Sequence, residues 1–157
     1  MKISLKQATE SDAGAIQKIQ SKAFSSLLLK YQDYESSPAA ESVDDIFRRF
    51  HQHFTDYYLI MLGEESIGMI RVCNFGVECR LSPICILPEY QGNGYAQQAM
   101  ARMEARYPNA QKWELDTIMQ EEKLCYLYEK VGYRKTGRVD HLKDGMDLVF
   151  YEKDITQ

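Results

Sequence analysis

The sequence predicts one α/β domain built on a single mixed sheet. Its 157 residues fit one ordinary domain that can bury its own core without a metal ion or a disulfide. Hydrophobic residues make up 45% of the chain and charged residues 27%, which is the balance of a globular protein. Strand-like and helix-like patterns follow one another in the order β-α-α-β-β-β-α-β-α-β-β, without an internal repeat or a low-complexity linker. We therefore expect residues 1–157 to form a single domain with about four helices flanking the sheet.

The first part of the chain predicts one short strand and two helices. Residues 3–7 alternate apolar and polar side chains, as a strand does, and residues 9–12 resemble a helix start. Apolar residues then recur at helical spacing up to Leu27, and residues 30–42 break this period. We expect a loop of unusual length there, followed by a second helix over about residues 43–53.

Three strands are expected next. Residues 57–62 and 67–73 are apolar and enclose a turn, which is typical of a hairpin. A longer strand should run over residues 77–87, with Pro83 inside it. Because proline has no N–H to donate to a neighbouring strand, this strand should be bulged or unpaired at Pro83.

The last part of the chain predicts two helices, a strand and a closing hairpin. A helix follows the glycine-containing residues 91–95, a strand covers residues 112–117, and a further helix over residues 121–131 ends at Gly132. The hairpin joins residues 133–139 to residues 146–152 around an Asp-Gly pair at 144–145.

Charge and cysteine content exclude several classes of function. The 19 basic and 23 acidic residues leave a net charge of −4, and no basic stretch stands out, so we expect neither nucleic acid nor an anionic membrane as partner. The four cysteines show no C-x-x-C spacing and no histidine follows at a zinc-like distance, so no metal site is expected. The chain shows no secretory apolar core and no membrane-spanning run, which predicts a cytoplasmic protein.

The most informative segment lies between the strand of residues 77–87 and the following helix. Gly92, Gly94 and Ala96 are small enough for backbone N–H groups to converge on one point, and the helix N-terminus adds its dipole. These features suit a diphosphate. The segment lacks the Gly-Lys-Ser/Thr of a P-loop and the Gly-x-Gly-x-x-Gly of a dinucleotide site. Taken alone, Gly-x-Gly favours an ordinary strand-to-helix turn over a ligand site.

Together with a second motif, this segment resembles the GNAT acyltransferase superfamily. That family places Gln/Arg-x-x-Gly-x-Gly/Ala at a strand-to-helix turn, and Gln91, Gly94 and Ala96 occupy these positions. Residues 127–133, Leu-Tyr-Glu-Lys-Val-Gly-Tyr, resemble the Leu-Tyr-x-Lys-x-Gly-Phe run of the family's last helix, and the element order matches over nearly the whole chain. The resemblance implies a mostly antiparallel, splayed sheet and an N-acetyltransferase that uses acetyl-CoA without a metal.

The resemblance also implies roles for individual residues. The pyrophosphate of CoA would lie on the backbone of the loop, and the preceding strand would offer backbone groups to the pantetheine arm. The loop residues are Gln91, Gly92, Asn93, Gly94, Tyr95 and Ala96, and the strand residues are Ile84, Cys85 and Ile86. Glu121 stands where the family commonly has an asparagine that contacts CoA, so this contact is either missing or made by the main chain.

Tyr128 is the expected general acid. A phenol with a pKa of about 10 stays protonated at neutral pH and can donate to a thiolate whose parent thiol has a pKa of about 8.5. The alternative is a helix tyrosine that only packs against the sheet.

Glu78 and Asp116 are candidates for a general base. Glu78 would share a strand face with Arg80, which favours an ion pair over a base. Ordered water can also take the proton from the incoming amine.

The acceptor site is expected at residues 31–41 and at the hairpin loop 141–144, because loops on a rigid scaffold commonly carry specificity. Carboxylates and aromatic faces there could bind a cation. The candidates are Tyr31, Tyr34, Glu35 and His141, and a solvated surface loop is the alternative.

The sequence thus favours direct transfer of an acetyl group from acetyl-CoA to an amine of a small molecule or peptide. An acyl group carried by Cys85 is disfavoured, since no histidine is placed to activate the thiol. A CoA-binding sensor without catalysis, and a protein-interaction module on the same fold, remain the alternatives. A homodimer is possible.

Overall fold

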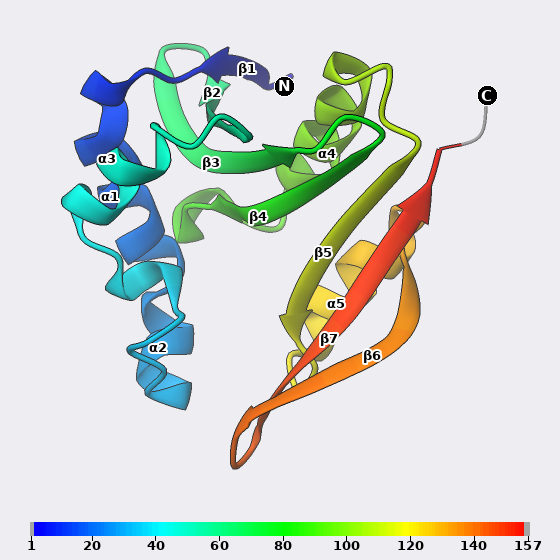
Figure 1. Ribbon diagram of the computed structural model, residues 1–157. Coiled ribbons are helices and arrows are strands. Elements are labelled where there is room, and N and C mark those ends of the chain that lie inside the picture. Colours follow the sequence, from blue (N-terminus) through cyan, green and yellow to red (C-terminus); the bar gives the residue numbers. More distant parts are fainter. Residues whose placement is uncertain (1, 156–157) are drawn as a thin grey trace.

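The chain folds as an open, twisted sheet with helices on both faces (Figure 1). The computed structural model describes residues 2–155. In these residues the strands are β1 (Ser4–Gln7), β2 (Thr55–Leu62), β3 (Glu65–Asn74), β4 (Glu78–Ile86), β5 (Lys112–Ile118), β6 (Arg134–Lys143) and β7 (Met146–Asp154). The helices are α1 (Ala13–Ala23), α2 (Ser25–Tyr31), α3 (Val43–Arg49), α4 (Tyr95–Arg106) and α5 (Glu122–Lys130), with short 3-10 turns at η1 (Glu10–Asp12), η2 (Pro38–Ala40) and η3 (Pro88–Tyr90).

The sheet has the order β1-β2-β3-β4-β5-β7-β6, and β4 with β5 forms its parallel pair. These two strands pair over three residues each, from Glu78 to Arg80 and from Lys112 to Glu114. Beyond this junction they diverge, and Figure 1 shows β4 and β5 leaving it in different directions. The predicted mostly antiparallel, splayed sheet is confirmed. We call the space between the diverging strands the fork.

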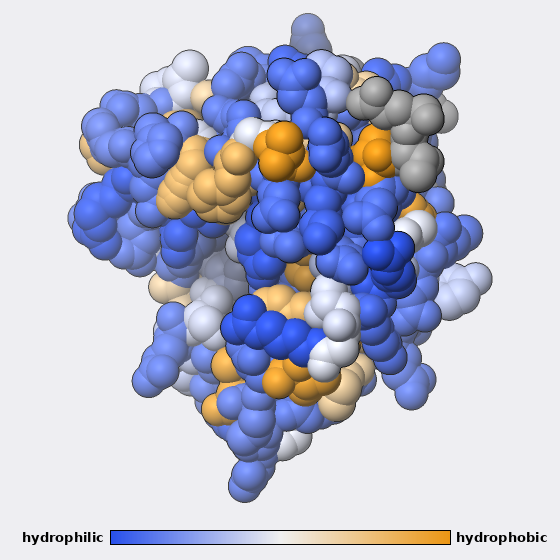
Figure 2. Space-filling view, turned by 45° about the vertical axis from the view of Figure 1, so that its right-hand side comes forward, coloured by the Kyte–Doolittle hydropathy of each residue, from blue (hydrophilic) through white to orange (hydrophobic). Residues whose placement is uncertain are grey.

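Two apolar clusters fix the helices to the two faces. Adjacent residues of a strand point to opposite faces, so Met69 lies under α1 and α3 while its neighbour Ile70 lies under α4 and α5. The first cluster includes Ile16 and Ile46, and the second includes Met103 and Tyr128. Outside the core, Figure 2 shows one face on which hydrophilic residues predominate and hydrophobic ones form small groups.

The strand predictions hold within a few residues, but the helical region before β2 differs from expectation. The expected first helix breaks at Phe24, where the backbone leaves helical geometry and Ser25 donates its hydroxyl to the carbonyl of Lys22 at 3.0 Å. A separate α2 follows and ends at Gln32, which has a φ of 56°. The predicted long loop therefore begins with the end of α2 and contains η2. The helix expected over residues 43–53 ends at Arg49.

The predicted bulge at Pro83 is confirmed. Ile70 pairs with Ile84, and Val72 pairs with Leu81, so Ser82 and Pro83 together face the single residue Arg71. The extra residue in β4 bends this strand directly after its last pair with β5.

Candidate active site

The free edge of β4 forms one wall of the fork. Leu87 donates its N–H to the carbonyl of Ile67, and Cys85 is the register partner of Met69. Since antiparallel pairs alternate between hydrogen-bonded and non-hydrogen-bonded, Cys85 exchanges hydrogen bonds with β3, whereas the backbone of Ile84 and Ile86 faces the other way. Of the three expected strand residues, Ile84 and Ile86 therefore turn their backbone groups to the fork.

The loop after β4 ends in a helix whose first N–H groups have no side-chain cap. Gly94 is the N-cap of α4 and has a φ of 77°, and Gly92 has a φ of 82°. A left-handed backbone is costly for most residues other than glycine. Gly94 also has no side chain that could accept from the first turn of α4. These N–H groups, at the positive end of the helix dipole, are suited to an anion.

Two side chains hold the loop in place. Gln91 donates Nε2–H to the carbonyl of Ile86 at 2.9 Å, which ties the loop to the end of β4. Asn93 donates Nδ2–H to the carbonyl of Tyr90 at 3.1 Å. Gln91 and Asn93 thus shape the loop through their side chains, and the backbone of Gly92, Gly94, Tyr95 and Ala96 stays available for a ligand.

Tyr128 lies in the core cluster between α5 and the sheet and is 7% exposed. Its ring is 6.3 Å from that of Tyr133 and 6.4 Å from that of Tyr151, measured between centroids. Burial raises the pKa of Tyr128 above its ordinary value, and the nearby thiols of Cys85 and Cys125 act in the same direction. The phenol is therefore held in its protonated form.

The comparison with protein families agrees with this arrangement. The model of the Acetyltransferase (GNAT) family matches residues 15–133, which span the helices before β2, the fork and α5. The chain belongs to the GNAT acetyltransferase family. As a GNAT member it is an acyl-CoA N-acyltransferase with acetyl-CoA as cosubstrate, in agreement with the sequence prediction.

Solved structures share the GNAT fold over almost the full length of this chain. An acetyltransferase from Thermus thermophilus is 18% identical with a TM-score of 0.77 and covers 99% of this chain and 98% of its own. PaiA N-acetyltransferase from Thermoplasma acidophilum, in complex with coenzyme A, is 14% identical with a TM-score of 0.79. The match covers 99% of this chain and 100% of that protein. Spermidine N-acetyltransferase from Vibrio cholerae, in complex with CoA and spermine, is 19% identical with a TM-score of 0.75. The match covers 96% of this chain and 94% of that protein. A search of curated proteins gave no significant sequence match.

In this GNAT chain Glu121, at the position of the family's asparagine, contacts α2. Its carboxylate accepts from Tyr31 Oη at 2.5 Å and from Lys30 Nζ at 2.7 Å. Both hydrogen bonds lower the pKa of Glu121, and the one from Lys30 has the larger effect. Tyr31, expected in the acceptor site, instead joins α2 to the start of α5.

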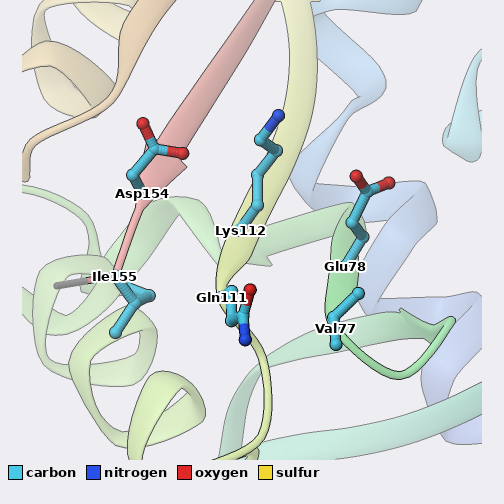
Figure 3. A pocket seen from close by; sticks show the side chains of 6 residues that line it. All are labelled: Val77, Glu78, Gln111, Lys112, Asp154 and Ile155. Carbon is cyan, nitrogen blue, oxygen red and sulfur yellow. The ribbon is translucent and has the colours of Figure 1, made fainter. Parts of the chain in front are cut away.

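The two candidate bases lie in different places. Glu78 lies at the paired end of the fork, where it lines a hollow of about 490 Å³ (Figure 3). Figure 3 shows Lys112 between Glu78 and Asp154 in this hollow. The expected ion pair of Glu78 with Arg80 is wrong. Arg80 instead binds Asp116 of β5 across the start of the fork, since Asp116 lies two residues beyond Glu114, the register partner of Arg80, on the same face of β5.

A second hollow, of about 370 Å³, lies beside the bulge of β4. We call it the bulge pocket. Two predicted acceptor residues, Tyr34 and Glu35, line it. The remaining lining residues are Ser36, Ser37, Pro38, Ala40, Glu41, Asp45, Arg49, Arg71, Ser82 and Pro83. His141 is not among them. It lies on β6, with Nδ1 at 2.8 Å from Asp147 Oδ1.

Sequence reasoning missed Arg71, which is 6% exposed in the floor of this pocket. Two signals were present: a single charged residue in the apolar run of residues 67–73, and a proline in the strand that pairs with it.

Within residues 2–155, no helix is long and apolar enough to cross a bilayer. The same part of the chain has no group of three or more His, Cys, Asp or Glu side chains placed to bind a metal ion.

Proposed function

We propose that this GNAT enzyme transfers the acetyl group of acetyl-CoA directly to an amine bound in the fork. One observation carries the proposal. The strand that diverges at the fork is followed, after η3 and the glycine-containing loop, by the uncapped N-terminus of α4, and α5 brings a buried tyrosine to the same core cluster as Ile86.

The cofactor would extend from the loop along β4. The backbone N–H groups at the start of α4 would bind the pyrophosphate, with Gln91 and Asn93 holding the loop. The backbone of Ile84 and Ile86 would bind the pantetheine arm. The carboxylate of Glu121 is already paired with Lys30 and Tyr31, which lessens its repulsion of an anionic cofactor.

The transfer forms a bond between the acceptor nitrogen and the acetyl carbon and breaks the bond from that carbon to sulfur. The N–H of Ile86 would donate to the thioester oxygen as negative charge develops on it. Tyr128 would give its proton to the departing thiolate. Water would remove the proton from the acceptor ammonium, because Asp116 is ion-paired with Arg80 and Glu78 lies at the paired end of the fork.

A covalent acetyl-cysteine is disfavoured by the state of Cys85. This thiol is 8% exposed, and burial raises its pKa to about 12. Only the thiolate is a good nucleophile, so Cys85 would be almost wholly unreactive at neutral pH. Direct transfer needs no acyl-enzyme and should give sequential kinetics.

Amine acceptors are consistent with the solved relatives. The Vibrio cholerae enzyme is a spermidine N-acetyltransferase, and another structure of the same fold is the ribosomal-protein-S18-alanine N-acetyltransferase from Escherichia coli. We extend to this chain only what they share, an amine as acceptor.

The test compares two glycine variants. Gly94 and Gly145 have nearly equal φ values, 77° and 79°, and a Cβ at either position meets no atom within 4 Å. Gly94→Asp and Gly145→Asp therefore carry the same backbone cost, but only the first places a carboxylate at the start of α4. We expect saturating CoA to stabilise the parent and Gly145→Asp by about 2.7 kcal/mol at a hundred times the dissociation constant, and Gly94→Asp much less.

The result separates this proposal from its alternatives. A CoA-dependent shift lost only in Gly94→Asp, together with release of free thiol when amines and acetyl-CoA are added, would support the enzyme. Binding without thiol release for any amine would favour a CoA sensor. If CoA fails to shift the melting temperature of the parent, the proposal is wrong.

A further inference from the structure

Arg71 is a buried cation that has no carboxylate partner among residues 2–155. Its Nε donates to Thr55 Oγ1 at 3.3 Å, one terminal nitrogen to the carbonyl of Ser82 at 3.0 Å, and the other to Gln52 Oε1 at 3.0 Å. These three acceptors are neutral and use three of the five N–H groups of a guanidinium. A buried charge is costly unless it is paired, so the site is suited to an anion.

Two of the three carboxylates that line the bulge pocket already have ion-pair partners. Glu41 accepts from Arg49 Nε at 2.7 Å and from Gln20 Nε2 at 2.9 Å. Asp45 accepts from the N–H of Ser42 at 2.9 Å and also binds Arg48. Glu35 is exposed. With Glu41 paired to Arg49 and Asp45 paired to Arg48, Arg71 is the buried charge of the pocket that has no ion-pair partner among residues 2–155, and the exposed Glu35 is the carboxylate of the lining without such a partner.

A second buried group near the pocket is also unsatisfied. The hydroxyl of Tyr57 has no hydrogen-bond partner among the described residues, although Tyr57 is only 1% exposed. Arg71 and Tyr57 are direct cross-strand neighbours in β3 and β2, so their side chains lie on the same face. Burial raises the pKa of Tyr57 to about 12. The charge of Glu41 also raises this pKa, whereas the charges of Arg71 and Arg49 lower it. The hydroxyl is thus an unused donor on the residue paired with Arg71, although Tyr57 itself does not line the pocket.

The pocket adjoins the place where the acetyl group would be transferred. Its wall includes Ser82 and Pro83, and the last pair between β4 and β5 is formed by Arg80. A molecule in the pocket would therefore lie beside the first splayed residues of β4, on the face of α1 and α3. Its volume of about 370 Å³ is at the small end of ligand sites and suits one amino-acid-sized molecule.

We propose that the acceptor of this enzyme carries a carboxylate as well as its amine, and that Arg71 binds this carboxylate in the bulge pocket. The acceptor class is thus a free amino acid or a similar small amino acid-like molecule, with its amine directed into the fork. This inference rests on the acetyltransferase function proposed above. The competing role for Arg71 is to fill the bulge of β4 through the carbonyl of Ser82 alone.

The first experiment uses the parent protein and does not depend on the folding of a variant. A panel of free L-amino acids is compared with the corresponding carboxamides, which keep the amine and the side chain but lose the negative charge. Hydrogen bonds to a charged group change binding by about 10- to 150-fold. We expect kcat/KM for the preferred amino acid to exceed that of its amide by such a factor, mainly through KM.

The second experiment tests whether Arg71 is the cause of this preference for acids over amides. Arg71→Gln keeps a polar side chain with N–H donors but removes the charge, Arg71→Lys keeps the charge, and Arg102→Gln changes an exposed arginine of α4 as control. The acid-to-amide ratio should fall to about unity in Arg71→Gln, keep an intermediate value in Arg71→Lys, and stay unchanged in Arg102→Gln. The CoA-induced stabilisation should be the same in all of them.

The outcomes separate the two proposals. Equal use of acids and amides, or a preference for polyamines, while acetyl transfer and CoA binding are intact, would overturn only the inference about Arg71. A ratio that survives in folded Arg71→Gln would do the same. Absence of CoA binding in the parent would overturn the proposed function and the inference that rests on it.

Discussion

At the scale of single residues, burial determines how the fork can react. Tyr128 and Cys85 are both nearly inaccessible, and burial raises the pKa of each. For the phenol, this preserves the proton that a general acid has to give. For the thiol, the same effect removes the nucleophile. One physical cause thus favours direct transfer with Tyr128 as acid over an acyl-enzyme.

Replacing Tyr128 by phenylalanine should lower kcat by about 10²- to 10⁴-fold, the usual contribution of a general acid. The raised pKa of Tyr128 means that its proton is present throughout the pH range in which acceptor amines become neutral. The parent kcat/KM should therefore rise with pH as the amine deprotonates, with no decline due to Tyr128 below about pH 10. Steady-state rates between about pH 6 and pH 10 measure both effects.

Tyr126→Phe is the control, because Tyr126 lies two residues away on the same helix and is 68% exposed. Its kcat should equal that of the parent. An unchanged kcat in a folded Tyr128→Phe protein would leave Tyr128 with a packing role only.

Sequence reasoning proposed candidate residues where a motif had a backbone cause. Gly94 was predictable because a helix start that receives an anion requires a residue without a side chain. Arg71 was missed although it is a lone charge in an apolar run, since its importance depends on Ser82 and Pro83 facing it from another strand, and on Thr55 and Gln52 supplying only neutral acceptors. These are contacts between residues far apart in the sequence.

At the scale of elements, the distance between β3 and β4 is set by a glycine. A Cβ built on Gly68 would lie 2.3 Å from the carbonyl oxygen of Cys85. That oxygen belongs to the backbone of the strand expected to hold the pantetheine arm, so it cannot move aside without moving β4. Gly68 is therefore needed because it has no side chain, which lets β3 and β4 lie this close together.

Gly68→Ala should destabilise the protein by about 1–3 kcal/mol, the usual range for an overpacked site, and weaken acetyl-CoA binding as β4 is displaced. Gly14→Ala is the matched control, because it lies in α1 with no atom within 4 Å of its Cβ. It should leave stability unchanged or raise it by about 0.5–1 kcal/mol. Thermal unfolding with and without acetyl-CoA tests both variants, and equal stability of Gly68→Ala and the parent would contradict the expected clash.

Elements defined by local chemistry were predictable from the sequence, and those decided by packing were not. The closing hairpin has its turn at Asp144 and Gly145 as expected, because an Asp-Gly pair favours such a turn. The break at Phe24 was missed, because the apolar period continues through it to Leu27. At the end of α2, Tyr31 contacts Glu121, a residue 90 positions away.

At the scale of the whole molecule, polar contacts across the open end of the fork join its two halves. Lys30 and Tyr31 of α2 donate to Glu121 at the start of α5, and Lys143 Nζ lies 3.4 Å from the carbonyl oxygen of Gln32. The paired end of the fork is held by three residue pairs between β4 and β5. The bond between Tyr31 and Glu121 should therefore contribute to global stability.

Tyr31→Phe removes only the hydroxyl and should cost about 1–2 kcal/mol, which lowers the melting temperature by about 2–8 °C. The pKa of Glu121 is lowered in the folded protein, so the contribution is present above the ordinary glutamate pKa of about 4.3 and is lost as pH falls through the depressed value. The difference between parent and variant should thus shrink below about pH 4.

The control is Tyr34→Phe, whose hydroxyl reaches only Gln32 Oε1 at 3.1 Å from an exposed position. Its melting temperature should match that of the parent. Tyr31→Phe behaving like Tyr34→Phe at neutral pH would mean that the contact with Glu121 adds nothing to stability.

The order of the sheet also bears on how the protein behaves at high concentration. One end of the sheet is β6, a ten-residue strand whose outer edge pairs with no other strand of residues 2–155, and such edges can recruit strands from other molecules. Most residues of β6 have titratable side chains. The register of β6 with β7 also shifts around Gly137, which has a φ of 98°. The titratable residues are Arg134, Lys135, Arg138, Asp140, His141 and Lys143. Charge and an interrupted ladder discourage cross-strand recruitment, so β6 protects the molecule from edge-to-edge aggregation while its hairpin stays exposed to solvent.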